Sequence, residues 1–127
     1  MTSPTKISIA ERFSRFSETW SPKIVAALNG QHVKLARLDG EFVWHAHEDE
    51  DELFLVVEGD LTIEFRDAAG AATSVDLGPG ELIVVPRGVE HRPIARGEVK
   101  VLLFEPASTV NTGDAGGERT TAAQWLE

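Results

Sequence analysis

Apolar and polar residues alternate in short runs over most of this chain, which is the pattern of half-buried β-strands. From residue 24 onward, the runs are separated by turn residues such as Asn29-Gly30 and Gly78-Pro79-Gly80. No helical pattern of comparable length separates the runs, so we expect the strands to pair in an antiparallel manner. The predicted strands are residues 24–28, 32–38, 41–47, 52–57, 61–65, 73–77, 81–86 and 99–104.

The residues before the first strand predict a short helix over residues 8–16. Ser8 is followed three residues later by a glutamate, the spacing of a capping box. Ile9, Phe13 and Phe16 then recur at helical spacing. We expect these three apolar side chains to cover one end of the sheet.

The last part of the chain has a different composition. Residues 106–127 are rich in Gly, Thr and Ala, and they contain too few apolar side chains to build a core. Trp125 and Leu126 either dock into an apolar groove or stay exposed, and the sequence favours neither. We therefore expect one domain with three parts: an N-terminal segment at 1–23, an antiparallel β-barrel or jelly roll at 24–105, and an irregular tail at 106–127.

Composition and charge restrict the function. A chain of 127 residues fits a single domain. It contains no Cys, which excludes disulfides, iron–sulfur clusters, Cys-based zinc fingers and cysteine nucleophiles. The formal net charge of −9 argues against nucleic-acid and anionic-membrane partners. Residues 1–20 lack the apolar stretch of a signal peptide, so we expect a cytoplasmic protein.

Three of the four His residues and one Glu lie where a metal ion could bind them. His45 and His47 are two residues apart, so in a strand both rings point to the same face. Glu52 opens the apolar run 53–57, and a carboxylate at the mouth of a buried strand is costly unless it is paired or bound to a metal. His91 follows a Pro and Gly turn that can direct it back into the barrel.

These residues belong to two patterns that resemble the two motifs of the cupin superfamily. The resemblance implies a small single-domain cupin with a jelly-roll barrel (double-stranded β-helix). It also implies that His45, His47, Glu52 and His91 are the metal ligands. The patterns are Gly40-x4-His45-x-His47-x4-Glu52-x6-Gly59 and Gly80-x5-Pro86-x-Gly88-x2-His91.

The sequence departs from the family pattern at two positions. Four residues, 41–44, separate Gly40 from His45 where the family usually has five. Ala95 stands where the second motif often closes with Asn. Neither change removes a residue that matches a metal ligand, so we expect only the local turns to differ.

Three imidazoles and one carboxylate suit a transition metal. Fe, Mn, Ni, Co, Cu and Zn accept this mixture of nitrogen and oxygen ligands, whereas calcium and magnesium prefer sites made of oxygen alone. Four protein ligands on an octahedral ion leave two positions for water, dioxygen or a bidentate substrate. We therefore expect one divalent transition metal of unspecified identity.

Other residues near the motifs have less specific interpretations. Residues 48–51 are acidic and are expected to form a solvated loop that disfavours anionic substrates. Arg87 and Arg92 flank His91 and could bind a carboxylate or phosphate, although Arg92 should point away from the metal. His32 matches no ligand position, and it is expected on a surface or strand face.

The side chains around the site also have expected places. Trp44 alternates with the His pair, and it should face the opposite side, in a second layer or a subunit contact. Four apolar residues are expected to line the interior above the metal and to accommodate a small aliphatic or aromatic ligand. They are Phe54, Val56, Ile63 and Phe65.

Membership of the cupin superfamily does not determine the reaction. The first hypothesis is a metal-dependent enzyme on a small polar metabolite, with oxygenase, isomerase or lyase chemistry. A non-catalytic binding or sensing module is the alternative, because no obvious general base lies beyond the ligands. A third hypothesis is a sugar-phosphate isomerase, since residues 80–93 resemble mannose-6-phosphate isomerase-type cupins. The resemblance further implies a homodimer, with an edge strand near 24–38 as its contact.

Overall fold

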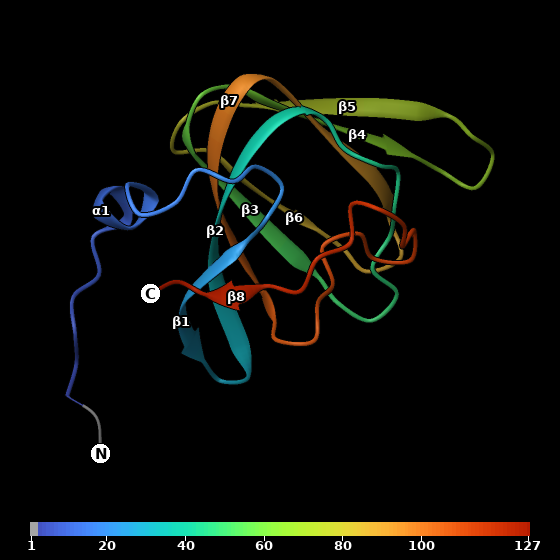
Figure 1. The fold of residues 1–127 in the computed structure, drawn as a ribbon. Coiled ribbons are helices and arrows are strands. Elements are labelled where there is room, and N and C mark those ends of the chain that lie inside the picture. Colours follow the sequence, from blue (N-terminus) through green and yellow to red (C-terminus); the bar gives the residue numbers. More distant parts are fainter. Residues whose placement is uncertain (1–2) are drawn as a thin grey trace.

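The computed structural model describes residues 3–127 and confirms an all-β jelly roll with one short helix (Figure 1). The strands surround a common interior, and the C-terminal tail lies across one side of it. The elements are α1 (Ile9–Phe13), β1 (Lys23–Leu28), β2 (Gln31–Glu41), β3 (Glu52–Glu58), β4 (Leu61–Arg66), β5 (Ala72–Leu77), β6 (Leu82–Val85), β7 (Glu90–Pro106) and β8 (Gln124–Trp125).

Strand β7 organises the sheet. It pairs with β2, β3 and β4, and the main path of the sheet runs β5-β4-β7-β2-β1-β8. Strand β3 pairs with β6 and β7 away from this path. All of these pairs are antiparallel, as predicted, except that β1 and β8 are parallel. One long strand therefore links the parts of the barrel that carry the sequence motifs.

The predicted strand over 41–47 is wrong. Strand β2 ends at Glu41, after a register shift between Leu38 and Gly40, and Gly40 has a φ of +84°. The chain then leaves the sheet, and only His45 forms an isolated bridge, with His91. The strand expected over 99–104 is longer than predicted, because β7 begins directly after the turn at residues 86–89.

The barrel interior and the helix form two apolar clusters. The main cluster includes Val56, Ile63 and Val101, none of which is exposed. The helix is shorter than the predicted 8–16. Its N-cap is Ser8, whose side-chain oxygen accepts a hydrogen bond from the backbone nitrogen of Glu11, as the capping pattern predicted. Phe13 and Phe16 pack with Leu35 of β2 in a second apolar cluster, which also includes partly buried side chains of β1, β3 and β7.

The tail is more ordered than its composition predicts. Leu126 donates a backbone hydrogen bond to Ile24, and its side chain packs against the second apolar cluster. Trp125 is 55% exposed and meets the ring of His32 edge-on. Because β8 pairs with β1, the chain's own tail covers the edge that was expected to form a dimer contact.

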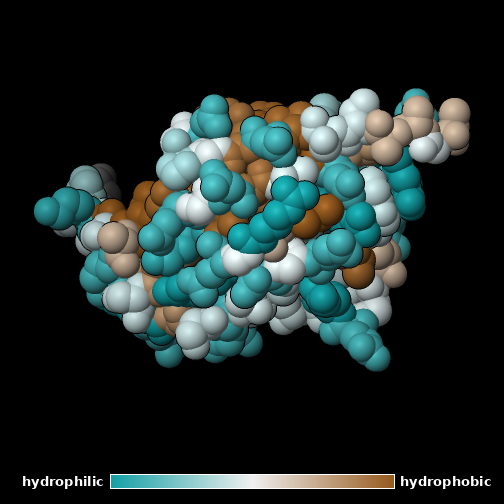
Figure 2. All heavy atoms as spheres, turned by 90° about the horizontal axis from the view of Figure 1, so that it is seen from above, coloured by the Kyte–Doolittle hydropathy of each residue, from teal (hydrophilic) through white to brown (hydrophobic). Residues whose placement is uncertain are grey.

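Charged and polar side chains cover most of the face seen in Figure 2, with apolar side chains exposed between them. Within residues 3–127, no helix has the length and apolar character needed to cross a membrane.

Candidate metal centre

The four predicted ligands come from three separate parts of the chain. His45 and His47 lie in the loop between β2 and β3, Glu52 is the first residue of β3, and His91 is the second residue of β7. The loop is tied to β7 by two backbone hydrogen bonds between His45 and His91, of 3.0 and 2.8 Å. The backbone nitrogen of Gly88 donates to the carbonyl of His47 at 2.8 Å. These bonds hold the loop against the start of β7 without a continuous strand.

The structure brings the four side chains together in the barrel interior. One donor atom from each of His45, His47, Glu52 and His91 lies within 4.8 Å of the others. All four residues are buried, with exposed fractions of 3%, 3%, 4% and 0%. The Nε2 atoms of His47 and His91 lie 3.5 and 3.7 Å from Oε1 of Glu52. Their role as metal ligands stays a prediction that this arrangement supports.

Hydrogen bonds orient two of the imidazoles. Nδ1 of His45 lies 2.9 Å from the carbonyl of Val43, and Nδ1 of His91 lies 2.9 Å from the carbonyl of Val89. A carbonyl can only accept, so each Nδ1 carries the proton and each Nε2 keeps a free lone pair. The Nε2 atoms of His47 and His91 are buried without a hydrogen-bond partner in the described chain. Such free donor nitrogens fit a transition metal.

Burial and neighbouring charges favour the ligand forms of these groups. Burial lowers the pKa of His45 to about 4, with a further contribution from His91, so the ring is neutral near pH 7. Burial alone raises the pKa of Glu52, but contacts with Glu105, His47 and His91 outweigh it, so the pKa lies well below the usual range. A neutral imidazole and an ionised carboxylate are the forms that bind metals.

A cavity borders the metal-binding group. His45 and Glu52 lie in its wall together with apolar side chains that include Phe42, Phe54 and Leu103. Of the four residues expected to line this interior, only Phe54 does so. Val56 and Ile63 belong to the closed core, and Phe65 packs against that core. The predicted apolar site therefore exists, but other residues form most of it.

The tail closes one side of this cavity. Thr109, Asn111, Thr121 and Ala123 are part of the wall. Ala46, between the two loop histidines, exchanges two hydrogen bonds with Asp114: its nitrogen donates to Oδ1 at 2.8 Å, and its carbonyl accepts from the Asp114 nitrogen at 3.0 Å. The sequence analysis did not predict this contact, because the tail has no apolar periodicity.

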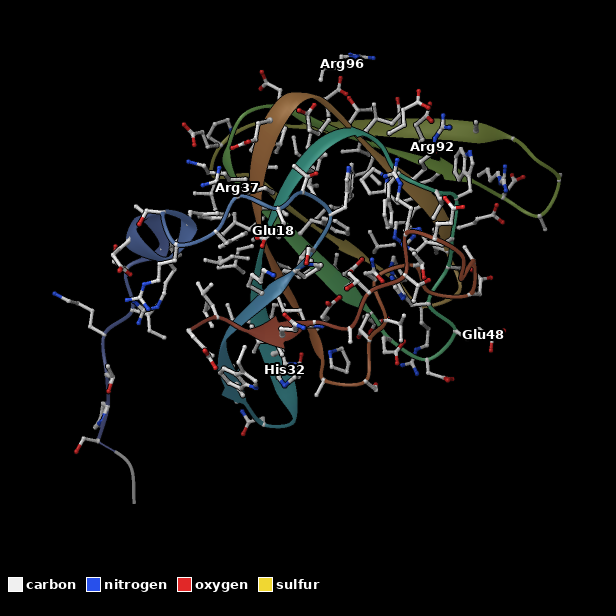
Figure 3. The ribbon with its side chains drawn as sticks, in the orientation of Figure 1. Glu18, His32, Arg37, Glu48, Arg92 and Arg96 are labelled. Carbon is white, nitrogen blue, oxygen red and sulfur yellow. The ribbon has the colours of Figure 1, made fainter. Side chains whose placement is uncertain are left out.

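The charged residues that flank the motifs lie outside the cavity wall. Arg92 donates to Glu64 and lies over the ring of Trp44, facing away from the metal-binding group as expected (Figure 3). Arg87 is largely exposed and is 3.9 Å from Asp51. Glu48 points outward from its loop (Figure 3). Neither arginine is placed to bind a ligand in the cavity.

Two acidic residues of the run 48–51 accept hydrogen bonds from other parts of the chain. Oδ1 of Asp51 accepts a hydrogen bond from the backbone nitrogen of Arg87, and Glu50 accepts one from Ser108. His32 lies near β8, apart from the other histidines, and is not in the metal-binding group (Figure 3).

A second polar group in the cavity wall was missed. Nζ of Lys34 lies 2.9 Å from Oε1 of Glu105, and both side chains are almost fully buried. The pKa of Glu105 is raised well above its usual range by burial and by the negative charge of Glu52, which the Lys34 ammonium opposes. In the sequence, the only signal was the position of Lys34 and Glu105 within otherwise apolar alternating runs.

Comparison with known proteins places this arrangement in a family. The Cupin_2 model, described as a cupin domain, matches residues 31–105. Protein YdbB from Bacillus subtilis (strain 168) is 36% identical over 84 residues, which cover 66% of this chain and 65% of that protein. The chain spans less than half the length of the germin-like proteins that it also matches.

Solved structures show the same fold. A cupin-2 domain containing protein from Shewanella frigidimarina NCIMB 400 is 45% identical, with a TM-score of 0.74 over 79% of this chain and 93% of that chain. Hydroquinone 1,2-dioxygenase from Sphingomonas sp. TTNP3 has a TM-score of 0.73 at 18% identity, over 82% of this chain and 33% of that chain, a likeness of fold alone. The family match, the fold and the buried histidines and glutamate lead to one conclusion: this chain belongs to the cupin superfamily, as a member of the Cupin_2 family.

Proposed function

We propose that this protein is a metal-dependent enzyme that acts on a small polar molecule bound beside the metal. The observation that carries the proposal is the convergence of His45, His47, Glu52 and His91 within 4.8 Å next to a cavity. This donor set suits Fe, Mn, Ni, Co, Cu or Zn. When bound, such a metal supplies Lewis-acid or redox chemistry to a substrate oxygen, which is compatible with oxygenase, isomerase or lyase reactions.

The protein's own residues prepare the site. The carbonyls of Val43 and Val89 fix the proton of His45 and His91 on Nδ1 and so keep Nε2 available. Glu52 contributes a negative charge where a cation would bind. The apolar side chains of the wall exclude water, which strengthens electrostatic interactions with a bound molecule.

A binding or sensing role is the second candidate, and the tail favours it. Thr109, Asn111 and Thr121 lie in the cavity wall, so a molecule in the cavity would contact the tail directly. Tight binding without turnover would support this role over catalysis. The sugar-phosphate alternative is not part of the proposal, because Arg87 and Arg92 lie outside the cavity wall.

Metal content and activity test the proposal together. Protein purified without chelator is expected to hold about one transition metal per chain. The His47→Ala variant should lose it, whereas His32→Ala, outside the metal-binding group, should keep it. Because one protein of this fold is a hydroquinone 1,2-dioxygenase, oxygen consumption with Fe(II) and hydroquinones is the first assay. Wild-type metal content in His47→Ala would contradict the proposal.

The proposal includes a homodimer located in the cytoplasm. Strand β8 covers the edge of β1 where the dimer contact was expected, so the proposed contact lies at β6 instead. Strand β6 exposes two large apolar residues, Leu82 and Val84, at 56% and 51%. Light scattering on the purified chain tests the dimer, and a monomer at all accessible concentrations would contradict it.

A further inference from the structure

The cavity wall holds a buried ion pair that the proposed function does not use. Lys34 and Glu105 are joined at 2.9 Å, with side chains 2% and 3% exposed. Both line the cavity that His45 and Glu52 also line. Burying two charges costs desolvation energy that their attraction offsets only partly. An apolar pair would fill the same volume at lower cost, so stability alone is a poor reason for charges at this place.

The pair has unused hydrogen-bonding capacity that faces the cavity. A Lys ammonium has three N–H donors, and the one hydrogen bond of Lys34 Nζ within residues 3–127 goes to Glu105. Oγ1 of Thr109, which can donate as well as accept, is buried with no partner in the same part of the chain. Thr109 is 7% exposed and lies in the same cavity wall. Buried polar atoms are rarely left unpaired, which indicates that another molecule completes this group.

The balance of charge indicates the sign of that molecule. A divalent metal and the Lys34 ammonium together exceed the negative charge of Glu52 and Glu105, even with both carboxylates ionised. An excess positive charge in a buried cavity is costly unless an anion neutralises it. The acidic residues 48–51 do not neutralise it, because they lie in the loop outside the cavity wall. With both carboxylates ionised, one negative charge on the ligand would balance the site.

The rest of the wall restricts the size and character of the ligand. Apolar side chains such as Phe54, Val101 and Leu103 make up much of the remaining surface. The cavity offers about 40 Å³ to the centres of water-sized molecules. One water needs roughly 10 to 15 Å³ measured in this way, so the space fits a few waters or a short organic acid. A bulky dianion such as a sugar phosphate does not fit this description.

We propose that Lys34, together with Glu105 and Thr109, forms a subsite that binds the carboxylate of a small monocarboxylic acid in the cavity beside the metal. This inference rests on the proposed function, and it names the substrate class of the same site. The Lys34 ammonium donates to the carboxylate, and Thr109 supplies a hydroxyl donor. Glu105 holds the Lys34 side chain in place and so acts as a positioning residue.

Calorimetric titration with propionate and its neutral analogue propionamide tests the subsite on metal-loaded protein. The wild type should bind propionate at least about tenfold more tightly than propionamide. The double variant Lys34→Met/Glu105→Gln removes both charges and leaves no unpaired buried ion. It should lose this preference. Lys100→Met, which breaks the exposed pair with Glu58, is the matched control and should keep it.

Metal content, measured in the same samples, separates a failure of the proposed function from a failure of the subsite. A wild type without metal would contradict the proposed function and the subsite together. A metal-loaded wild type without preference for propionate, or a metal-loaded double variant that retains the preference, would overturn the subsite alone. If the double variant loses metal or fold, Thr109→Val decides, because it keeps both charges: several-fold weaker propionate binding supports the subsite, and unchanged binding overturns it.

Discussion

Two groups of buried polar side chains share one cavity, and their charges are balanced in different ways. In the metal-binding group, Glu52 lies 3.5 and 3.7 Å from the ring nitrogens of His47 and His91, which lack hydrogen-bond partners at Nε2 in the described chain. In the second group, Lys34 pairs directly with Glu105. The first group therefore consists of three imidazoles and one carboxylate, whereas the second contains the Lys34 ammonium as its own cation.

This difference explains what each group requires. A cluster of neutral imidazoles and one carboxylate is stabilised by a metal ion, which pairs the free nitrogens and the negative charge at once. A buried ion pair needs no ion, but each of its members depends on the other to avoid an uncompensated charge. Removing one member of the pair should therefore cost stability directly, while changes in the first group should act mainly through metal binding.

The largest effect is expected for Lys34→Met. It leaves Glu105 buried without its partner, which should lower the free energy of unfolding by about 3 to 5 kcal/mol in urea denaturation. Lys100→Met removes the lysine of a more exposed pair and should cost less than about 1 kcal/mol. Equal losses of unfolding free energy in the two variants would show that the Lys34–Glu105 pair stabilises the fold no more than an exposed pair does.

A pH series tests the neutral state of the first group in metal-free protein. The pKa of His45 falls from 6.5 to about 4 on folding, so the unfolded chain binds a proton more readily between these values. The stability contributed by neutral His45 is present above pH 6.5 and is lost as the pH falls through 4. This shift in the pKa of His45 corresponds to about 3 kcal/mol in the free energy of unfolding.

The matched variants isolate this contribution. Wild type and His32→Gln should both lose stability over that pH range, and His45→Gln should lose about 3 kcal/mol less, measured by urea denaturation at each pH. The same pH dependence in all three proteins would contradict the assigned state of His45.

A smaller effect is expected where the tail meets the metal-binding loop. A Cβ atom on Gly113 would lie 2.3 Å from the carbonyl oxygen of Ala46, and the φ of Gly113 is +52°. Gly113→Ala should lower stability by about 2 kcal/mol. Gly116 has a φ of +61° and no close neighbour, so Gly116→Ala should lose only the stability that the left-handed backbone conformation costs an alanine. Thermal denaturation compares them, and an equal loss would show that the tail does not pack tightly on the loop.

The two groups also differ in how far the sequence predicted them. The prediction that His45, His47, Glu52 and His91 converge rests on their match to the two cupin motifs. It did not require the correct local structure: residues 42–47 form a loop rather than the predicted strand, yet the histidines still converge.

The Lys34–Glu105 pair left no comparable signal. Both faces of β2 are buried, since Leu35 packs under the helix while Ala36 and Leu38 face the main core. Alternation therefore cannot assign Lys34 to the inside. The pairing with Glu105 depends on contact between β2 and β7, at a separation of 71 residues. For the same reason, the tail's place over the cavity, made by polar contacts such as Ala46 with Asp114, could not be predicted from composition.

X-ray absorption at the metal edge of the purified protein tests the central claim most directly, because it reports the ligands themselves. We expect nitrogen and oxygen ligands at roughly 2.0 to 2.2 Å from the metal, with the multiple scattering of about three imidazoles. A spectrum of oxygen ligands without imidazole scattering would contradict it.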